Sequence, residues 1–173
     1  MSTLLELLKY ILPSLIVFFT AYYTIRMLIR NDQKRRDYEI MLKNKNVITP
    51  IQLQAYERLT LFLERISPDA LAMRLNKEKL TVKQLQNEML KTIRAEFDHN
   101  VSQQVYISSK AWETIKNAKE RTIKLINTTA LSLKADAPAI HLSKALLEKV
   151  AEQETSATKV AIEYLKNEIR NYF

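Results

Sequence analysis

The stretch KYILPSLIVFFTAYYTIRMLIRNDQKRR, residues 9–36, decides where the rest of the chain can lie. Three interpretations compete for it: a buried core helix, a cleaved secretion signal and a membrane span. Residues 10–29 would form a helix of about 30 Å, which matches the hydrocarbon thickness of a bilayer. No residue between Lys9 and Arg26 is charged. The stretch therefore predicts a transmembrane helix, within an anchor that covers residues 1–30.

The two other interpretations fit the flanking residues less well. A buried core helix rarely stays uncharged for so long and then carries a cluster of cations at one end. A signal peptide needs a basic start and small residues before its cleavage point. Here Glu6 balances Lys9, and no A-x-A-like site follows. We therefore expect this segment to span a membrane.

The residues beside the apolar run predict its orientation. Residues 26–45 contain seven Lys and Arg, whereas the N-terminal flank has only Lys9 and the α-amino group. The positive-inside rule then places the N-terminus outside and the C-terminal part in the cytoplasm. The cations expected at the lipid headgroups are Arg26, Arg30, Lys34, Arg35 and Arg36. The aromatic residues expected at the two interfaces are Tyr10, Tyr22 and Tyr23. We favour a role of the cations in topology alone over specific lipid recognition.

The composition excludes several common kinds of active site. The 173 residues include no Gly and no Cys. Phosphate-binding loops, dinucleotide fingerprints and nucleophile elbows need Gly for close backbone approach or positive φ. Without Cys there is neither a disulfide framework nor a Cys-ligated zinc site. Residues 1–46 hold eight Lys and Arg against four acids, and residues 47–173 hold nineteen against fifteen, so the short first part is denser in charge.

Hydrophobic periodicity predicts an all-α fold after the anchor. Residues 31–48 are expected to form a basic juxtamembrane helix or linker that ends near residues 44–46. Apolar residues then recur at helical spacing through residues 49–173. Five or six amphipathic helices with short connections favour a cytoplasmic antiparallel helical bundle. Whether residues 138–173 form one helix or two stays open at this point.

Capping residues mark the expected helix boundaries. The expected helix starts are Thr49 with Pro50, Ser67 with Pro68, Thr81 with Gln84 as a capping box, and Ser108 or Ser109. Asn76 is expected to end a short helix in place of Gly. Residues 101–108 are ambiguous, and we interpret them as a helix end and a connector before a helix over about residues 110–133. The polar residues 152–156 suggest a break or kink.

A few residues resemble parts of functional sites. Glu96 and His99 have the Glu-x-x-His spacing of di-iron carboxylate bundles, which places both side chains on one helix face. Such a site needs a second pair, and His141 has no Glu three residues before it. We interpret His99 as a surface or capping residue, Trp112 as part of the core, and the aromatic ending 171–173 as docked on the bundle. No catalytic residue, cofactor site or metal site is predicted.

Two stretches carry a resemblance to other proteins. They are QLQAYERLTLFLERISPDAL (52–71) and EFDHNVSQQVYISSKAWETIKNAKE (96–120). The chain resembles an uncharacterised family of small single-span membrane proteins from Bacteroidota, over nearly its whole length. The resemblance implies a bacterial inner-membrane setting. It implies no activity and brings no site residues.

The sequence leaves three hypotheses about function. The favoured one is a membrane-anchored, non-catalytic interaction or scaffold protein, or an accessory subunit of an inner-membrane complex. Its partners would be the lipid bilayer and an unidentified protein or further copies of the chain. The alternative is a membrane tether for ribosomes or another nucleic-acid assembly. The cations proposed for that role are Lys116, Lys119, Arg121 and Lys124, although Glu113 and Glu120 interrupt the patch. An enzyme is the third and least favoured hypothesis.

Overall fold

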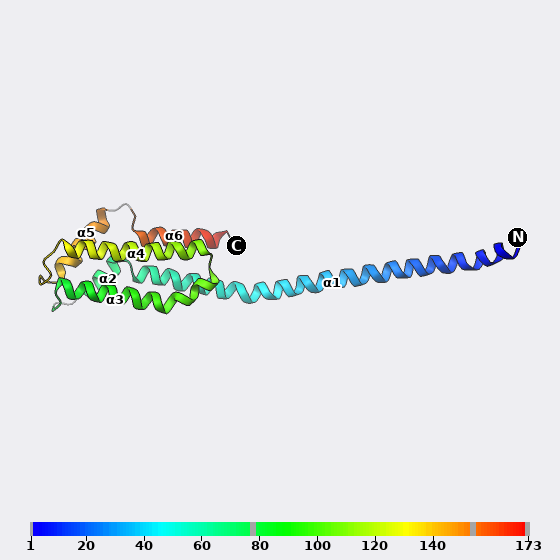
Figure 1. Cartoon of the computed structure of the whole chain (residues 1–173), viewed down its shortest axis with the longest axis horizontal. Coiled ribbons are helices and arrows are strands. Elements are labelled where there is room, and N and C mark those ends of the chain that lie inside the picture. The colour runs from blue at the N-terminus through cyan, green and yellow to red at the C-terminus, as the bar shows by residue number, and fades with distance from the viewer. Residues whose placement is uncertain (1, 77–78, 153–154, 172–173) are drawn as a thin grey trace. The chain divides into compact units, whose positions relative to one another are not determined.

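A computed structural model describes residues 2–76, 79–152 and 155–171, without the side chains of residues 2–10, 12 and 44–47. Within these ranges the chain is all-α, as predicted, and contains no β-strand. The elements are α1 (Ser2–Arg65), α2 (Pro68–Leu75), α3 (Val82–Asn100), the 3₁₀ helix η1 (Val101–Tyr106), α4 (Ser109–Leu131), α5 (Ile140–Glu152) and α6 (Ala157–Arg170) (Figure 1). The chain divides into two compact units, unit 1 (Met1–Thr49) and unit 2 (Pro50–Phe173).

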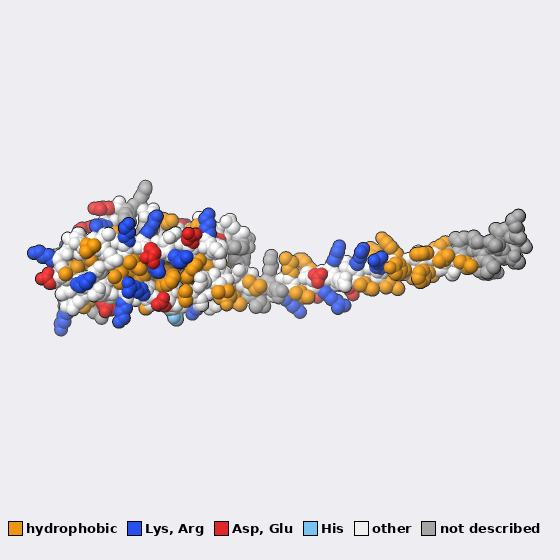
Figure 2. All heavy atoms as spheres, in the orientation of Figure 1, with side chains coloured by type: hydrophobic (Ala, Val, Ile, Leu, Met, Phe, Trp, Pro, Cys, Tyr) orange, Lys and Arg blue, Asp and Glu red, His pale blue; other side chains and the backbone are white. Residues whose placement is uncertain are grey.

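The prediction of a transmembrane anchor is wrong. Among the residues that the structure describes, no helix is long and apolar enough to cross a membrane. In residues 13–30, hydroxyl groups, tyrosines and two arginines interrupt the apolar run, and each polar group costs free energy in hydrocarbon. Figure 2 shows charged side chains of α1 close to its apolar ones. The assignment to a bacterial inner membrane, with a periplasmic N-terminus and a cytoplasmic C-terminal domain, is wrong with it.

The first helix is longer than the sequence predicts. Instead of ending near residues 44–46 and restarting at Thr49, α1 continues without a break to Arg65. Pro50 therefore lies inside a helix, where its missing N–H leaves the carbonyl of residue 46 without its usual donor. The boundary between the two units falls at this residue. A proline that signals a helix start in sequence is here tolerated in a helix interior.

The caps predicted for unit 2 are confirmed, with one difference in geometry. The Ser67 and Ser108 hydroxyls accept the N–H groups of Ala70 and Ala111, so they cap α2 and α4. Thr81 forms the expected capping box with Gln84 at the start of α3. Asn76 does end α2, but its backbone is extended (φ −69°, ψ 113°) rather than left-handed. Of the ambiguous residues 101–108, residues 101–106 form the helix η1, and the described part of residues 138–171 contains two helices, α5 and α6.

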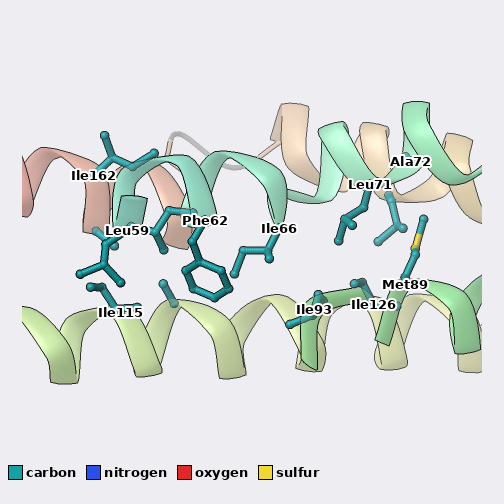
Figure 3. Packing of buried hydrophobic residues seen from close by; sticks show 14 of the residues in the cluster. Leu59, Phe62, Ile66, Leu71, Ala72, Met89, Ile93, Ile115, Ile126 and Ile162 are labelled. Carbon is teal, nitrogen blue, oxygen red and sulfur yellow. The ribbon is translucent and has the colours of Figure 1, made fainter. Parts of the chain in front are cut away.

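Unit 2 is a helical bundle around one apolar core. The last four turns of α1 pack in it with α2–α6, and the long helices that follow one another run in opposite directions (Figure 1). Leu59 and Phe62 on α1, and Ile66 just after it, point into the core, toward Ile115 on α4 and Ile93 on α3 (Figure 3). All five side chains are at most 1% exposed. Covering a side chain of this size contributes about 1.5–3 kcal/mol, so the core accounts for the stability of the bundle.

An aromatic row joins three helices of the bundle. The ring of Phe97 on α3 lies 6.0 Å from Phe62 on α1 and 5.4 Å from Trp112 on α4, centroid to centroid. Phe97 and Trp112 are stacked at 22°. Both are half-buried and pack against the core. The prediction that Trp112 belongs to the core is confirmed.

Candidate interaction surfaces

Unit 1 carries a line of large apolar side chains along α1. Its members are Ile11, Leu15, Phe18, Tyr22, Ile25 and Ile29, and we call this set the apolar seam. The intervals between them are four, three, four, three and four residues, which is the spacing of the contact positions in a coiled coil. Each of the six side chains is between 46% and 63% exposed. Apolar side chains on other sides of this helix, among them Val17, Phe19 and Leu28, are exposed to a similar degree, so it is the spacing that distinguishes the seam.

One polar group beside the seam is already satisfied within the helix. The hydroxyl of Ser14 donates to the carbonyl of Ile11 at 2.8 Å. Covering this group would thus break no hydrogen bond to protein. Within the seam, the rings of Phe18 and Tyr22 are stacked with their centroids 6.4 Å apart. This part of α1 can be covered by another apolar surface at low polar cost.

Three of the cations predicted to contact lipid headgroups share one face of α1. Arg26, Arg30 and Lys34 are four residues apart and line one shallow hollow with Tyr23. We call them the cationic stripe. At 100° per residue, the stripe lies roughly 60–140° around the helix from the apolar seam. The two surfaces meet at Arg26, whose guanidinium lies over the Tyr22 ring of the seam, 5.8 Å from its centroid. Contact of the stripe with lipid headgroups stays a prediction.

Of the other described residues assigned to the membrane boundary, Tyr23 lines the hollow of this stripe, and Arg35 and Arg36 do not. Arg35 pairs with Glu39 at 3.6 Å, one turn further along the helix. Arg36 is exposed on another side of α1. Tyr22 and Tyr23 are both exposed, but as adjacent residues they point about 100° apart. The side chain of Tyr10 lies outside the described residues.

The basic patch proposed for nucleic acid is divided by the structure. Lys119 extends its ammonium group over the ring of Phe97, 4.0 Å from the centroid, and pairs with Glu120 at 3.1 Å. Its side chain is only 18% exposed. Arg121 lies two residues on, roughly 200° around α4, so the two cations face different neighbouring helices. The four cations therefore do not form one basic face.

In the Glu96–His99 pair, Glu96 contacts an arginine of another helix. Both carboxylate oxygens of Glu96 lie 3.4 Å from a guanidinium nitrogen of Arg65, which links α3 to the end of α1. His99 is exposed. Within the described ranges, no three His, Asp or Glu side chains come together where they could hold a metal ion. At the end of the chain, Asn171 caps α6, while Tyr172 and Phe173, predicted to dock on the bundle, lie outside those ranges.

Sequence reasoning missed a polar link across the bundle. One carboxylate oxygen of Glu168 on α6 accepts the hydroxyl of Tyr56 on α1 at 2.6 Å. The other accepts the hydroxyl of Ser108, the N-cap of α4, at 3.0 Å. Three helices are thus joined through one side chain. Ser108 was recognisable as a cap, but no local pattern connects it to residues 52 positions before it and 60 after it.

The pKa of the Glu163 carboxyl on α6 is shifted from its ordinary value. The pKa of Glu163 is lowered by the hydrogen bond from Lys166 at 2.7 Å, then by the charge of Lys166 and of Arg170, while burial opposes the shift. Glu163 and Lys166 are both more than half exposed. This is a solvent-facing ion pair one turn apart on a helix, an arrangement that also occurs far from active sites.

Comparison with known proteins assigns the chain to a family. A family model matches residues 2–172. The chain belongs to the DUF7935 family. That family is described as one of unknown function, which confirms the predicted resemblance to an uncharacterised family, while the bacterial group stays a prediction. No curated protein and no solved structure matches the chain.

The DUF7935 match extends over both units of the chain. It covers the apolar seam as well as the whole described bundle. Unit 1 is thus part of what defines DUF7935 and is not an addition to this one chain. An account of the DUF7935 fold has to explain both the closed bundle and the exposed helix.

Proposed function

We propose that this protein is a non-catalytic scaffold whose copies pair through the apolar seam of α1, each copy carrying one helical bundle. The observation that supports this most is the exposure of all six seam side chains at coiled-coil spacing. Apolar groups at this density are costly in water, and pairing of two helices removes them from it. Unit 1, whose apolar side chains are exposed, is thus the unit that would contact the second copy.

The choice of a second copy as the partner rests on the arrangement of charge. The apolar seam contains no charged residue, so two identical seams can face each other without repulsion. Arg30 and Lys34 of the cationic stripe lie on a different part of the helix surface, while Arg26 covers the edge of the seam with its guanidinium over the Tyr22 ring. Identical surfaces that match each other are the usual basis of a two-fold dimer.

The non-catalytic part of the proposal is supported by the polar groups of the bundle. Several of the buried hydroxyls cap helices or bond to backbone carbonyls: Ser67 and Ser156 are caps, and Thr122 donates to Ala118. Glu168 and Glu96, the carboxylates with partners on other helices, hold those helices together. These groups are already used in the fold, which favours a binding role over a chemical one.

The decisive experiment is sedimentation velocity of the full chain at several concentrations. The wild-type protein, at 20.2 kDa per chain, should sediment as a dimer in the micromolar range. The variant Phe18→Gln/Ile25→Gln should be monomeric there, because it places two amides in the seam while keeping good helix formers.

A matched control tests whether pairing depends on the seam itself or on any exposed apolar side chain of α1. Ile16 and Met27 are 57% and 66% exposed and lie roughly 140–160° around the helix from the seam. The variant Ile16→Gln/Met27→Gln should therefore remain a dimer. A wild-type protein that is monomeric at tens of micromolar, or two double variants that dissociate equally, would contradict the proposal.

A further inference from the structure

Unit 2 has an open groove on its surface, between α4 and the start of α6. Its volume is about 450 Å³, and Arg121, Lys124 and Thr128 line it from α4. Val160 lines it from α6, and Thr155 precedes that helix. A second hollow of about 190 Å³ adjoins it, since Arg121 and Val160 line both. The two hollows together follow α4 over residues 114–128, a distance of about 21 Å.

The charge of the groove is not balanced by its own described residues. Arg121 and Lys124 are both exposed, and neither has an ion pair within the part of the chain that the structure describes. None of the described residues that line the two hollows is acidic. Lys119 on the same helix differs, because Glu120 and the Phe97 ring already hold its ammonium group. The groove thus keeps two cations available for a ligand of opposite charge.

The groove is also lined by apolar side chains. They are Leu125, Ala157 and Val160, of which Val160 is 52% exposed, and they lie beside the hydroxyl-bearing residues Thr122, Thr128, Thr155 and Ser156. A ligand that fits must therefore combine negative charge with an apolar group. Aromatic side chains are missing from the described lining, so the groove offers no platform on which a nucleic acid base could stack. Carboxylates on a polypeptide fit these features better than phosphates on a nucleic acid.

We infer that the groove binds an extended acidic peptide of a partner protein. Two of the peptide's carboxylates would pair with Arg121 and Lys124, and an apolar side chain between them would cover Leu125 and Val160. At about 3.3 Å per residue, a groove of this length holds roughly six residues. Only unit 2 takes part, so the inference holds or fails independently of the pairing of α1.

The test is fluorescence anisotropy of a fluorescein-labelled hexapeptide, Glu-Asp-Leu-Glu-Asp-Leu, titrated with the full chain. The wild-type protein should bind it, and Arg121→Gln/Lys124→Gln should weaken binding at least tenfold. The control Lys91→Gln/Arg94→Gln removes the same two kinds of charge at the same spacing from exposed positions on α3, and should change binding less than twofold. Circular dichroism establishes that both variants fold.

Three results would overturn the inference. The first is a wild-type protein that does not bind the peptide at millimolar concentration and low salt. The second is an equal loss of binding in the two variants, since this would mean attraction by net charge alone. The third is a labelled oligothymidylate that binds more tightly than the peptide and loses its affinity in the Arg121→Gln/Lys124→Gln variant.

Discussion

Replacing Glu168 by alanine should destabilise the bundle by about 2–4 kcal/mol. The carboxylate accepts hydrogen bonds from the hydroxyls of Tyr56 (2.6 Å) and Ser108 (3.0 Å), and a hydrogen bond to a charged group contributes about 1.5–3 kcal/mol. Two such bonds would contribute about 3–6 kcal/mol, and because the site is only partly buried we expect a value near or below the lower end of that sum. The Ser108 hydroxyl also caps α4, and losing its acceptor loosens that helix start.

The measurement is urea unfolding followed by the fluorescence of Trp112, which is the single tryptophan and lies within the bundle. The matched control is Glu163→Gln, another carboxylate on α6 whose partner is on the same helix. A double-mutant cycle with Glu168→Gln and Tyr56→Phe should give a coupling energy of about 1 kcal/mol or more. If Glu168→Ala changes stability no more than Glu163→Gln does, the link between the three helices is not energetically significant.

Three further predictions concern single groups of unit 2. Ser143→Ala should leave stability unchanged or raise it by about 1 kcal/mol in thermal unfolding, because the buried Ser143 hydroxyl has no hydrogen-bond partner among the described residues. Thr81→Ala should cost about 1 kcal/mol in the same assay, since it removes the hydroxyl that accepts the N–H of Gln84; a loss near zero would mean that the capping box does not contribute. The pKa of Glu163 is lowered from 4.5 in the folded state, so its contribution is present above that pH and is lost as the pH falls through the lowered value. The stability difference between wild type and Glu163→Gln should therefore shrink below about pH 4 and stay constant above about pH 6, and the opposite trend would refute the assignment.

Much of the bundle could be predicted from the sequence because its signals are local. A cap such as Thr81 and its partner Gln84 lie within one turn, and the apolar positions of α3 and α4 repeat at the period of the helix. Such patterns need no knowledge of neighbouring helices. The all-α class, the caps and the separation of most helices follow from them.

The features that were missed depend on contacts or context beyond one turn. The pattern of Thr49 followed by Pro50 is typical of a helix start, yet α1 continues through it, because a proline inside a helix costs a limited free energy that other interactions can offset. In the sequence Lys119 is one of a group of basic residues, but in the fold its ammonium group lies over the ring of Phe97 on α3. The role of Glu168 depends on residues far away in the chain. The membrane prediction gave too little weight to the polar residues within the apolar run.

Disulfide trapping of introduced cysteines tests the pairing of α1 most directly, because the natural chain contains no Cys. Ile25→Cys lies in the apolar seam, and Met27→Cys lies on the opposite side of the same helix, both at exposed positions. Under mild oxidation we expect rapid crosslinking of Ile25→Cys with itself if the helices are parallel, or with Leu15→Cys if they are antiparallel. Met27→Cys should stay reduced. Crosslinking at Met27 as fast as at Ile25, or none at any seam position, would contradict the proposal that the chains pair through this surface.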